Sequence, residues 1–342
     1  MKAKKNLSSR QLYFLIVSIV TSILWSQVLV YGETKPIILK MSHQFPPHSV
    51  LSQEATYWAN LVEKRTEGRI KFKHFYSSSL VKPPQVFDAL REDVADVGWG
   101  AISFITGKVP DVAILEFQDH APIDKLVEVY EKITPTLTEI FANYDLQYIF
   151  CTYVGVQGYG ATKKFLKSPD DFKGMKMRAA GRGIIRALEL WGASPVFLDV
   201  GDVYTALQRG TIDGSNAVLS VWKALKIYEV CPYYTYCGWN LSNFIYIAMN
   251  SKKWNSISQK DQSIMLKAGH DAMLFSDEFG RKEETEIMNE FIANKNMHFY
   301  KLTKEEQARL LRMTLPMWEE ARKNAGPLGK RMIDILVKYR AW

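Results

Sequence analysis

Residues 168–217 contain the pattern that most restricts the fold, an alternation of short apolar runs with helix-length segments. We expect strands at 174–179 and 195–198, helices at 184–191 and 202–209, and a further strand entered at 211–213. Gly210 follows the second helix, as is common at a helix C-terminus. Units of this β-α-β kind place their strands side by side and parallel, so the region predicts an α/β fold.

The same alternation occurs in the first third of the chain. Strands are expected at 36–42, 69–76 and 96–99, with helices at 49–64 and 83–92 between them. Two prolines open the second of these helices, as expected in a first helical turn. Two regions with one order of elements indicate two lobes, each a mostly parallel sheet flanked by helices.

The C-terminal third is predicted to be helical. Residues 258–261 resemble a capping box, and helix-forming residues without proline continue to about 296. An unbroken helix there would be roughly 54 Å long at 1.5 Å per residue, long enough to span both lobes. Division at Gly269 or Gly280 is the alternative. Further helices are expected at 305–325 and 329–339.

The N-terminus has the three parts of a secretory signal peptide. Basic residues at 2, 4, 5 and 10 precede an apolar run over 12–25, and small or branched residues precede a predicted cut after Gly32. The alternative is an uncleaved anchor, but polar residues interrupt the run and shorten it. We therefore expect residues 1–32 to be removed and the mature protein to be periplasmic.

Charge and cysteine content exclude several functions. The net charge of +8 falls to +4 without residues 1–32, because 40 basic and 36 acidic residues remain. This excess is too small to indicate nucleic-acid binding. Cys231 and Cys237 either form a disulfide or, as we favour, are buried thiols like Cys151. No Cys/His spacing matches a zinc site, and no metal is expected.

Arg178 is the residue most suited to binding a ligand. It lies at the carboxyl end of a predicted strand, the edge at which open α/β sheets bind ligands. Its planar guanidinium matches a carboxylate, and Gly181 and Gly183 lead into a helix N-terminus that favours negative charge. The alternative is a surface arginine, or one paired with Asp199 or Asp202.

Catalytic groups are not evident in the sequence. Gly181 and Gly183 lack the third glycine of a dinucleotide fingerprint, and there is no nucleophile motif, P-loop or base with a partner. We therefore expect no catalytic residue, no cofactor and no enzymatic activity. His43 follows the first strand and either contacts a ligand or is solvated. Three tryptophans near predicted strand ends or the following turns belong either to the core or to the floor of a pocket: Trp99, Trp222 and Trp239.

Several segments together resemble the solute-binding proteins of tripartite ATP-independent periplasmic (TRAP) transporters, the DctP family. The most specific match runs from KGMKMR at 173–178 through VYTALQ at 203–208 to the Asp213–Gly214 pair. The opening strand and helix with TEGR at 66–69, ALREDVADVGWG at 89–100, and NSKKW at 250–254 before a long helix complete the pattern.

The resemblance implies a two-lobe periplasmic binding protein that captures an organic acid between its lobes and delivers it to a TRAP membrane permease. Lobe I would comprise 33–153 and 243–283, and lobe II 154–242 and 284–342. The protein is expected to be monomeric. Arg178 matches the family arginine that pairs with the ligand carboxylate. The full set of expected ligand-binding residues is Arg178, Asn216, Trp239, Trp99, His43 and Trp222.

Three departures from the family pattern concern the ligand. Gly158 aligns with a second arginine present in many members, Val200 with an aromatic residue, and Asn216 with a carboxylate. These changes predict a monocarboxylate that is larger or more apolar than a C4-dicarboxylate. Two alternatives remain at this point: a binding protein that serves a membrane sensor, and an exported α/β enzyme.

Overall fold

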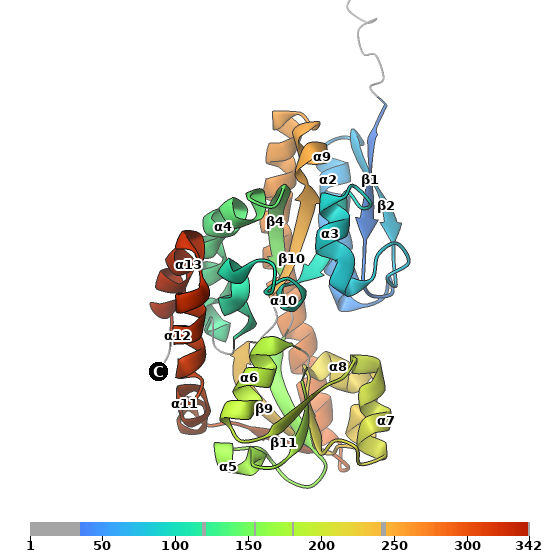
Figure 1. Cartoon of the computed structure of the whole chain (residues 1–342). Coiled ribbons are helices and arrows are strands. Elements are labelled where there is room, and N and C mark those ends of the chain that lie inside the picture. The colour runs from blue at the N-terminus through green and yellow to red at the C-terminus, as the bar shows by residue number, and fades with distance from the viewer. Residues whose placement is uncertain (1–34, 118–120, 154, 180, 241–243, 341–342) are drawn as a thin grey trace, which may run out of the picture. The chain divides into compact units, whose positions relative to one another are not determined.

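Two sheets organise the computed structural model, which describes residues 35–117, 121–153, 155–179, 181–240 and 244–340 (Figure 1). In the first sheet β1 and β3 are parallel, whereas β10 is antiparallel to both β3 and β4. The order of its strands is β2 (Ile70–Phe75), β1 (Ile37–Ser42), β3 (Val97–Ala101), β10 (Ile245–Asn250) and β4 (Leu146–Thr152).

The second sheet has six strands and one antiparallel insertion, β5, between β9 and β8. Strands β8, β6 and β7 are parallel to one another, as are β9 and β11. Its order is β11 (His298–Lys301), β9 (Tyr233–Asn240), β5 (Val156–Ala161), β8 (Gly214–Asn216), β6 (Lys176–Ala179) and β7 (Ser194–Phe197). The predicted α/β class with two mostly parallel sheets is confirmed.

The predicted helices of the βαβ units form close to their expected positions. Ser49 is the N-cap residue of the first of them, α2, whose apolar face is buried against the first sheet and α10. The helices between the strands are α2 (Val50–Arg65), α3 (Val86–Arg91), α4 (Leu126–Ala142), α5 (Pro169–Phe172), α6 (Arg182–Leu190), α7 (Val203–Gln208), α8 (Leu219–Ala224) and α9 (Ser251–Asn255).

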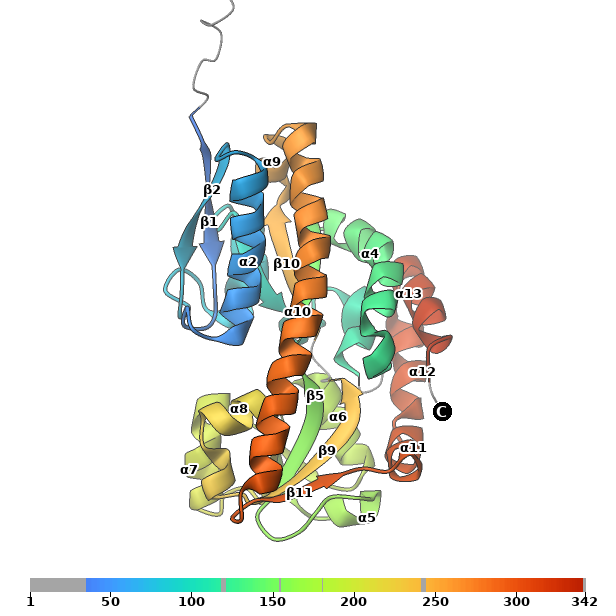
Figure 2. The same cartoon turned by 180° about the vertical axis from the view of Figure 1, so that it is seen from behind.

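The long C-terminal helix is unbroken. Helix α10 runs from Gln259 to Ala293, 35 residues, and begins with the Ser258 side chain accepting a hydrogen bond from the Asp261 backbone. It packs on α2 and β4 of the first sheet and on α8 and β11 of the second (Figure 2). Neither Gly269 nor Gly280 divides it, because both are buried against neighbouring elements rather than exposed as caps.

The prediction of a single helix at 305–325 is wrong, because two helices occupy this segment. Helix α11 (Lys304–Arg312) ends before Thr314, and α12 (Leu315–Asn324) begins with Pro316 in its first turn. A proline lacks the amide hydrogen that a continuous helix needs and disfavours helical geometry in the residue before it. The last helix, α13 (Pro327–Val337), packs on α4 and on the 3-10 helix η3 (Pro110–Glu116).

Two apolar clusters cover opposite faces of the second sheet. Tyr159 and Cys237 belong to one cluster, whereas Tyr234 and Cys231 belong to the other. Alternate residues of a strand point to opposite faces, which separates Tyr234 from Cys237. All three cysteines are buried free thiols, so the favoured alternative for Cys231 and Cys237 is confirmed.

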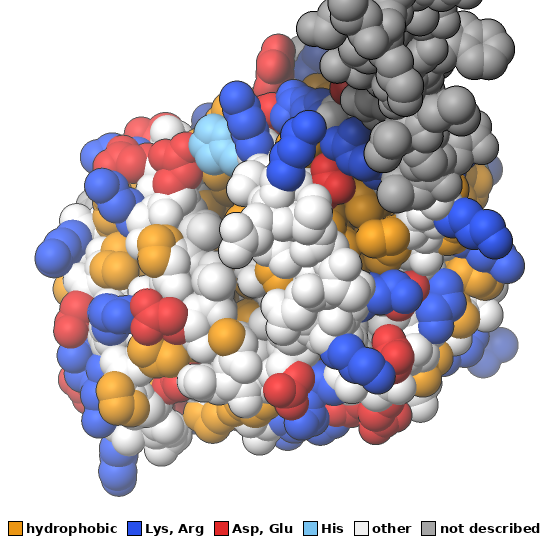
Figure 3. All heavy atoms as spheres, turned by 90° about the horizontal axis from the view of Figure 1, so that it is seen from above, with side chains coloured by type: hydrophobic (Ala, Val, Ile, Leu, Met, Phe, Trp, Pro, Cys, Tyr) orange, Lys and Arg blue, Asp and Glu red, His pale blue; other side chains and the backbone are white. Residues whose placement is uncertain are grey.

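From Ile38 onward the chain forms one compact unit. The predicted signal peptide, 1–32, and its cut after Gly32 lie outside the described residues. Among the described helices none is both long and apolar enough to cross a membrane. Positive and negative side chains are interspersed on the face shown in Figure 3.

Candidate ligand-binding site

Arg178 lies on β6, close to the carboxyl edge of the second sheet, and is only 6% exposed. Its Nε donates a hydrogen bond to the Leu198 carbonyl at 3.0 Å, and its Nη1 donates to the Asn216 carbonyl at 3.1 Å. These two bonds fix the plane of the guanidinium from both neighbouring strands. The side chain is therefore held in one orientation before any ligand arrives.

This buried cation has no ion-pair partner among the described residues. Burial lowers the pKa of Arg178 to about 10, and the negative charge of nearby Asp199 opposes the shift without forming a salt bridge. The group nevertheless stays charged at neutral pH. A buried charge without a counterion is costly, so the site is ready to accept an anion.

Further polar groups without partners lie near the same edge. The register pairs Arg178 with Ser215 and Tyr159 with Asn216, so β5, β8 and β6 are adjacent strands. Asn216 Oδ1 and Gln157 Oε1 are buried and accept no hydrogen bond from a described residue. The structure thus places the predicted pair, Arg178 and Asn216, on neighbouring strands, and adds Gln157 to them.

The predicted aromatic residues are all buried. Trp239, next to the last residue of β9, belongs to one apolar cluster, and Trp222, on α8, packs against Tyr234 in the other. Trp99 lies on β3 of the first sheet, edge-to-face with Phe45. The indole N–H groups of all three find no acceptor among the described residues. Their role in ligand binding stays a prediction.

His43 follows β1 at the carboxyl edge of the first sheet. Its Nε2 is 2.8 Å from Nδ1 of His74, and its ring stacks on Tyr76. Burial, with a smaller contribution from the His74 charge, lowers the pKa of His43 to about 3. His43 is therefore neutral at physiological pH and offers a polar, uncharged surface. Arg178 and His43 belong to different sheets.

A tyrosine ring occupies the space beside Gly158, the position at which the resemblance predicts a second arginine in many family members. A Cβ atom on Gly158 would collide with the Tyr234 ring and hydroxyl, and that hydroxyl donates to the Ala217 carbonyl at 2.8 Å. A longer side chain at 158 has no room unless Tyr234 moves. The absence of a second cation at this position follows from packing.

Two residues that contact the segments adjoining Arg178 were missed from the sequence. Phe197 ends β7, pairs with Ala179, and is 61% exposed despite its apolar ring. Glu116 ends η3, and its Oε1 accepts a hydrogen bond from the Arg182 backbone at 3.1 Å. The run ILEF gave no sign that its glutamate is buried. Phe197 was identifiable only as the last residue of a predicted strand.

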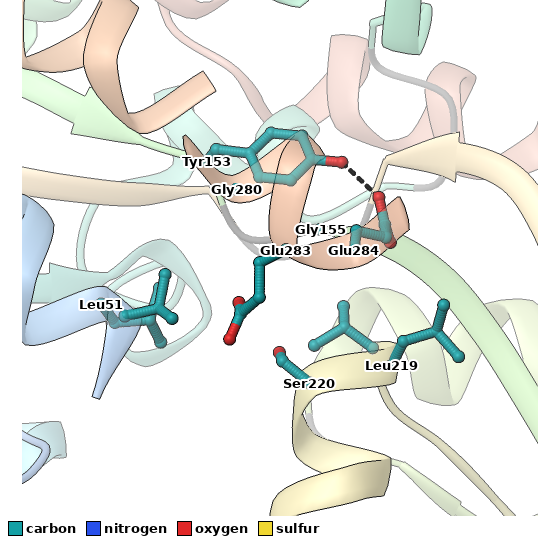
Figure 4. A pocket seen from close by; sticks show the side chains of 10 residues that line it. Leu51, Tyr153, Gly155, Leu219, Ser220, Gly280, Glu283 and Glu284 are labelled. Carbon is teal, nitrogen blue, oxygen red and sulfur yellow. Dashed lines mark hydrogen bonds between the residues drawn. The ribbon is translucent and has the colours of Figure 1, made fainter. Parts of the chain in front are cut away.

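A separate pocket lies beside the connection from β4 of the first sheet to β5 of the second, and its lining includes two glutamates (Figure 4). Glu283 points into it between Leu51 and Ser220, and Glu284 accepts a hydrogen bond from the Tyr153 hydroxyl at 2.6 Å. Arg178 does not line it. Two carboxylates make this pocket unsuited to an anion. Among the described residues no cluster of histidine, cysteine and carboxylate groups could hold a metal ion.

Comparison with known proteins identifies the family of the chain. The family model described as bacterial extracellular solute-binding protein, family 7 (DctP) matches residues 41–324. The C4-dicarboxylate-binding periplasmic protein DctP of Rhodobacter capsulatus is 24% identical over 302 residues, covering 85% of this chain and 88% of that protein. A monocarboxylate 2-oxoacid-binding periplasmic protein of Nostoc sp. is 28% identical over 224 residues, covering 63% of this chain and 60% of that protein.

Solved structures show the same fold. An apo, open TRAP periplasmic solute-binding protein from Marinobacter aquaeolei superimposes with a TM-score of 0.80 at 19% identity, covering 88% of this chain and 99% of that one. DctP7 of Bordetella pertussis, a receptor that binds pyroglutamic acid, gives a TM-score of 0.77 at 20% identity over 88% and 99% of the two chains. The resemblance seen in the sequence is confirmed, and the chain belongs to the DctP family of bacterial extracellular solute-binding proteins.

Proposed function

We propose that this protein binds an organic acid with a single carboxylate at Arg178, outside the cytoplasm, and delivers it to a TRAP-type membrane permease. One observation carries the proposal: Arg178 is buried, oriented by two carbonyls, and lacks an anionic partner among the described residues. A ligand carboxylate would accept hydrogen bonds from the remaining donors of the guanidinium and offset the cost of its burial.

The surroundings of Arg178 favour one carboxylate over two. Tyr234 fills the space at Gly158 in which a second cation would stand. Asn216 supplies a neutral side chain whose free oxygen accepts a hydrogen bond, so it suits a hydroxyl or amide N–H of the ligand. Exposed Phe197, the last residue of the neighbouring strand β7, adds apolar surface at the same edge of the sheet. A larger, partly apolar monocarboxylate fits these three features.

The ligands of similar proteins include both monocarboxylates and dicarboxylates, so they do not identify the ligand of this protein. Similar proteins bind pyroglutamic acid, 2-oxoacids, (S)-2-acetolactate, glucuronate and C4-dicarboxylates, as their descriptions state. Each of these ligands carries a carboxylate. Their variety supports a common carboxylate anchor and leaves the rest of the ligand to the residues that differ between members.

Capture would involve closure of two lobes about their connections. We propose lobe I at 33–153 and 243–283 and lobe II at 154–242 and 284–342, with the 1–32 segment removed on export. The packing of α13 on α4 is the feature that any such division has to accommodate. Closure excludes water from the Arg178–carboxylate pair and thereby strengthens it.

The test is calorimetric titration of the mature protein with pyruvate, 4-methyl-2-oxopentanoate, pyroglutamate and succinate. We expect a monocarboxylate to bind, and Arg178→Ala to weaken that binding by at least 100-fold, the usual consequence of removing one member of a buried charge pair. Arg186→Ala is the matched control, since Arg186 is exposed and paired with Glu189 and Glu320. Unchanged affinity in Arg178→Ala would reject the site. Tight binding of succinate alone would reject the monocarboxylate class.

A further inference from the structure

Glu116 reaches from the first-sheet region into the N-terminus of a helix of the second sheet. It ends η3, in the connection between β3 and β4, and is 2% exposed. Its carboxylate oxygen Oε1 accepts the hydrogen bond from Arg182, the first residue of α6. Helix α6 follows β6, the strand that carries Arg178, after only two intervening residues.

The contact is closely packed. A Cβ atom on Gly183 would collide with the Glu116 carbonyl oxygen, and one on Gly181 would lie 2.7 Å from Glu116 Oε1. An earlier part of the same β3–β4 connection also contacts residues 181–183, because the Arg182 guanidinium lies beside Gly107. Residues 103–116 therefore hold the segment 181–183, called here the α6 entry, in place.

The Glu116 side chain occupies the place at the N-terminus of α6 where an anion could bind. The α6 entry lies directly after the strand of the ligand arginine, and its free N–H groups favour negative charge. Glu116 places its carboxyl group there from within the protein. A second acidic group of a ligand would meet the Glu116 carboxylate there instead of unoccupied N–H groups.

Burial raises the pKa of Glu116 to about 7. The Arg182 and Gly183 backbone groups, the charge of Arg182 and the nearby Thr106 hydroxyl oppose the shift, although Thr106 Oγ1 makes no hydrogen bond of ordinary geometry. Other charged side chains lie on the elements packed around η3. Several of them have partners, in the pairs Arg186–Glu189, Arg186–Glu320, Arg322–Asp334, Arg331–Glu139 and Asp111 with the Gly326 amide. Glu319, Lys323 and Lys330 are exposed and form no salt bridge with a described residue.

We propose that Glu116 is a positioning residue for the ligand site, which docks the α6 entry beside Arg178 and couples this docking, and with it carboxylate binding, to the uptake of a proton. This inference deepens the proposed function and rests on it only for the ligand. The docked segment is favoured when Glu116 is neutral, because the ionised form must give up its water on docking.

The sign and size of the effect follow from linkage. The pKa of Glu116 is about 7 when docked and returns to the ordinary value of 4.5 when the contact opens. The docked state thus binds more protons between these values and loses stability as the pH rises through them. Above pH 7 little further change is expected. Between pH 8 and pH 6 the docking equilibrium should change about tenfold.

Hydrogen exchange of the ligand-free mature protein tests the docking directly. We expect the α6 entry, observed in peptides covering 181–185, to be about tenfold more protected at pH 6 than at pH 8 after correction for intrinsic exchange. Glu116→Gln should abolish this dependence. Asp111→Asn is the matched control, because Asp111 is a carboxylate on the same η3 that accepts a hydrogen bond from the backbone of α13's N-cap residue. Equal pH dependence in wild type and Glu116→Gln would overturn the proposal.

Calorimetry with pyroglutamate at pH 7, in buffers of different ionisation enthalpy, tests the coupling to binding. Wild type should take up a fraction of a proton on binding, and Glu116→Gln none. Binding without proton uptake in wild type would overturn the coupling. Failure of every acid in the panel to bind would count against the proposed function, while the exchange result for Glu116 would stand on its own.

Discussion

The carboxyl edge of the second sheet carries a buried guanidinium, whereas the same edge of the first sheet is lined by neutral groups. Arg178 lacks an anionic partner among the described residues. His43, at the first edge, is uncharged because burial holds its pKa near 3, and Trp99 beside it is a buried indole. A carboxylate therefore has one attractive edge, and the other edge offers only polar and aromatic contacts.

Under the proposed function, this difference would give the two edges separate tasks. The charged edge would provide long-range attraction and fix the orientation of the acid. The neutral edge would discriminate between ligand bodies, since neutral donors and aromatic faces respond to shape and hydrogen-bond pattern. We expect an acid to bind first at Arg178 and the first sheet to contribute on closure. The predictions below test each half of this contrast and the connection between them.

The largest effect is expected from His43→Gln in acid. A histidine with a folded-state pKa of about 3 binds no proton in the native protein until far below its unfolded value of 6.5. The wild type therefore loses stability as the pH falls from 6.5 toward 3, by roughly 3 kcal/mol at pH 4 from this group. The variant should lose that much less between pH 7 and pH 4, as measured by urea unfolding.

The control for this prediction is His48→Gln, because His48 is exposed five residues further along the chain. Its unfolding free energy should follow that of wild type at every pH. An acid profile of His43→Gln identical to wild type would mean that His43 takes up its proton as readily in the native protein as in the unfolded chain. The first edge would then carry a cation below about pH 6.5, and the contrast between the two edges would fail there.

The charged edge was predictable from sequence, and the reason is local. Arg178 ends an apolar run and precedes two glycines, so strand, loop and helix are readable from neighbouring residues. Its lack of a partner was not readable, since Asp199 and Asp202 were equally plausible counterions. The structure shows Asp199 near enough to affect the pKa of Arg178 but forming no salt bridge.

A medium effect on stability is expected where the connection from β4 to β5 is bound to α10. The Tyr153 hydroxyl donates to Glu284 on α10, and the other oxygen of Glu284 accepts from the Val156 backbone at 2.8 Å. Tyr153→Phe leaves a half-buried carboxylate with one bond fewer, which should lower the free energy of unfolding by about 1–3 kcal/mol. Tyr144→Phe, whose hydroxyl donates to a carbonyl at an exposed site, should cost under about 0.5 kcal/mol.

Equal losses in the two tyrosine variants would show that Glu284 is not a specific support of the connection. The two edges would then be joined by packing alone. Urea unfolding at pH 7 gives both values, and the slope of the transition shows whether the native state has loosened.

Contacts between distant segments account for what the sequence did not predict. Glu116 and Arg182 are 66 residues apart, and no spacing rule links η3 to the entry of α6. The unbroken course of α10 past two glycines depends on burial against elements of both sheets. Pro316, by contrast, was visible in the sequence, and the helix expected at 305–325 should have been divided there.

The smallest effect is expected from Phe197→Ala at the charged edge. Phe197 is 61% exposed and pairs with Ala179, the neighbour of Arg178, so it gives this edge an apolar side. Truncation should leave stability within about 0.5 kcal/mol of wild type. If the ligand body lies against the ring, the lost contact is worth about 1 kcal/mol, and the ratio of affinities for 4-methyl-2-oxopentanoate and pyruvate should fall about fivefold. The control is Ile292→Ala, which removes an equally exposed apolar residue, 60%, from α10 and should leave this ratio unchanged. If the ratio is unaffected in Phe197→Ala as well, the charged edge selects only the carboxylate, and discrimination between ligand bodies belongs to the neutral edge alone.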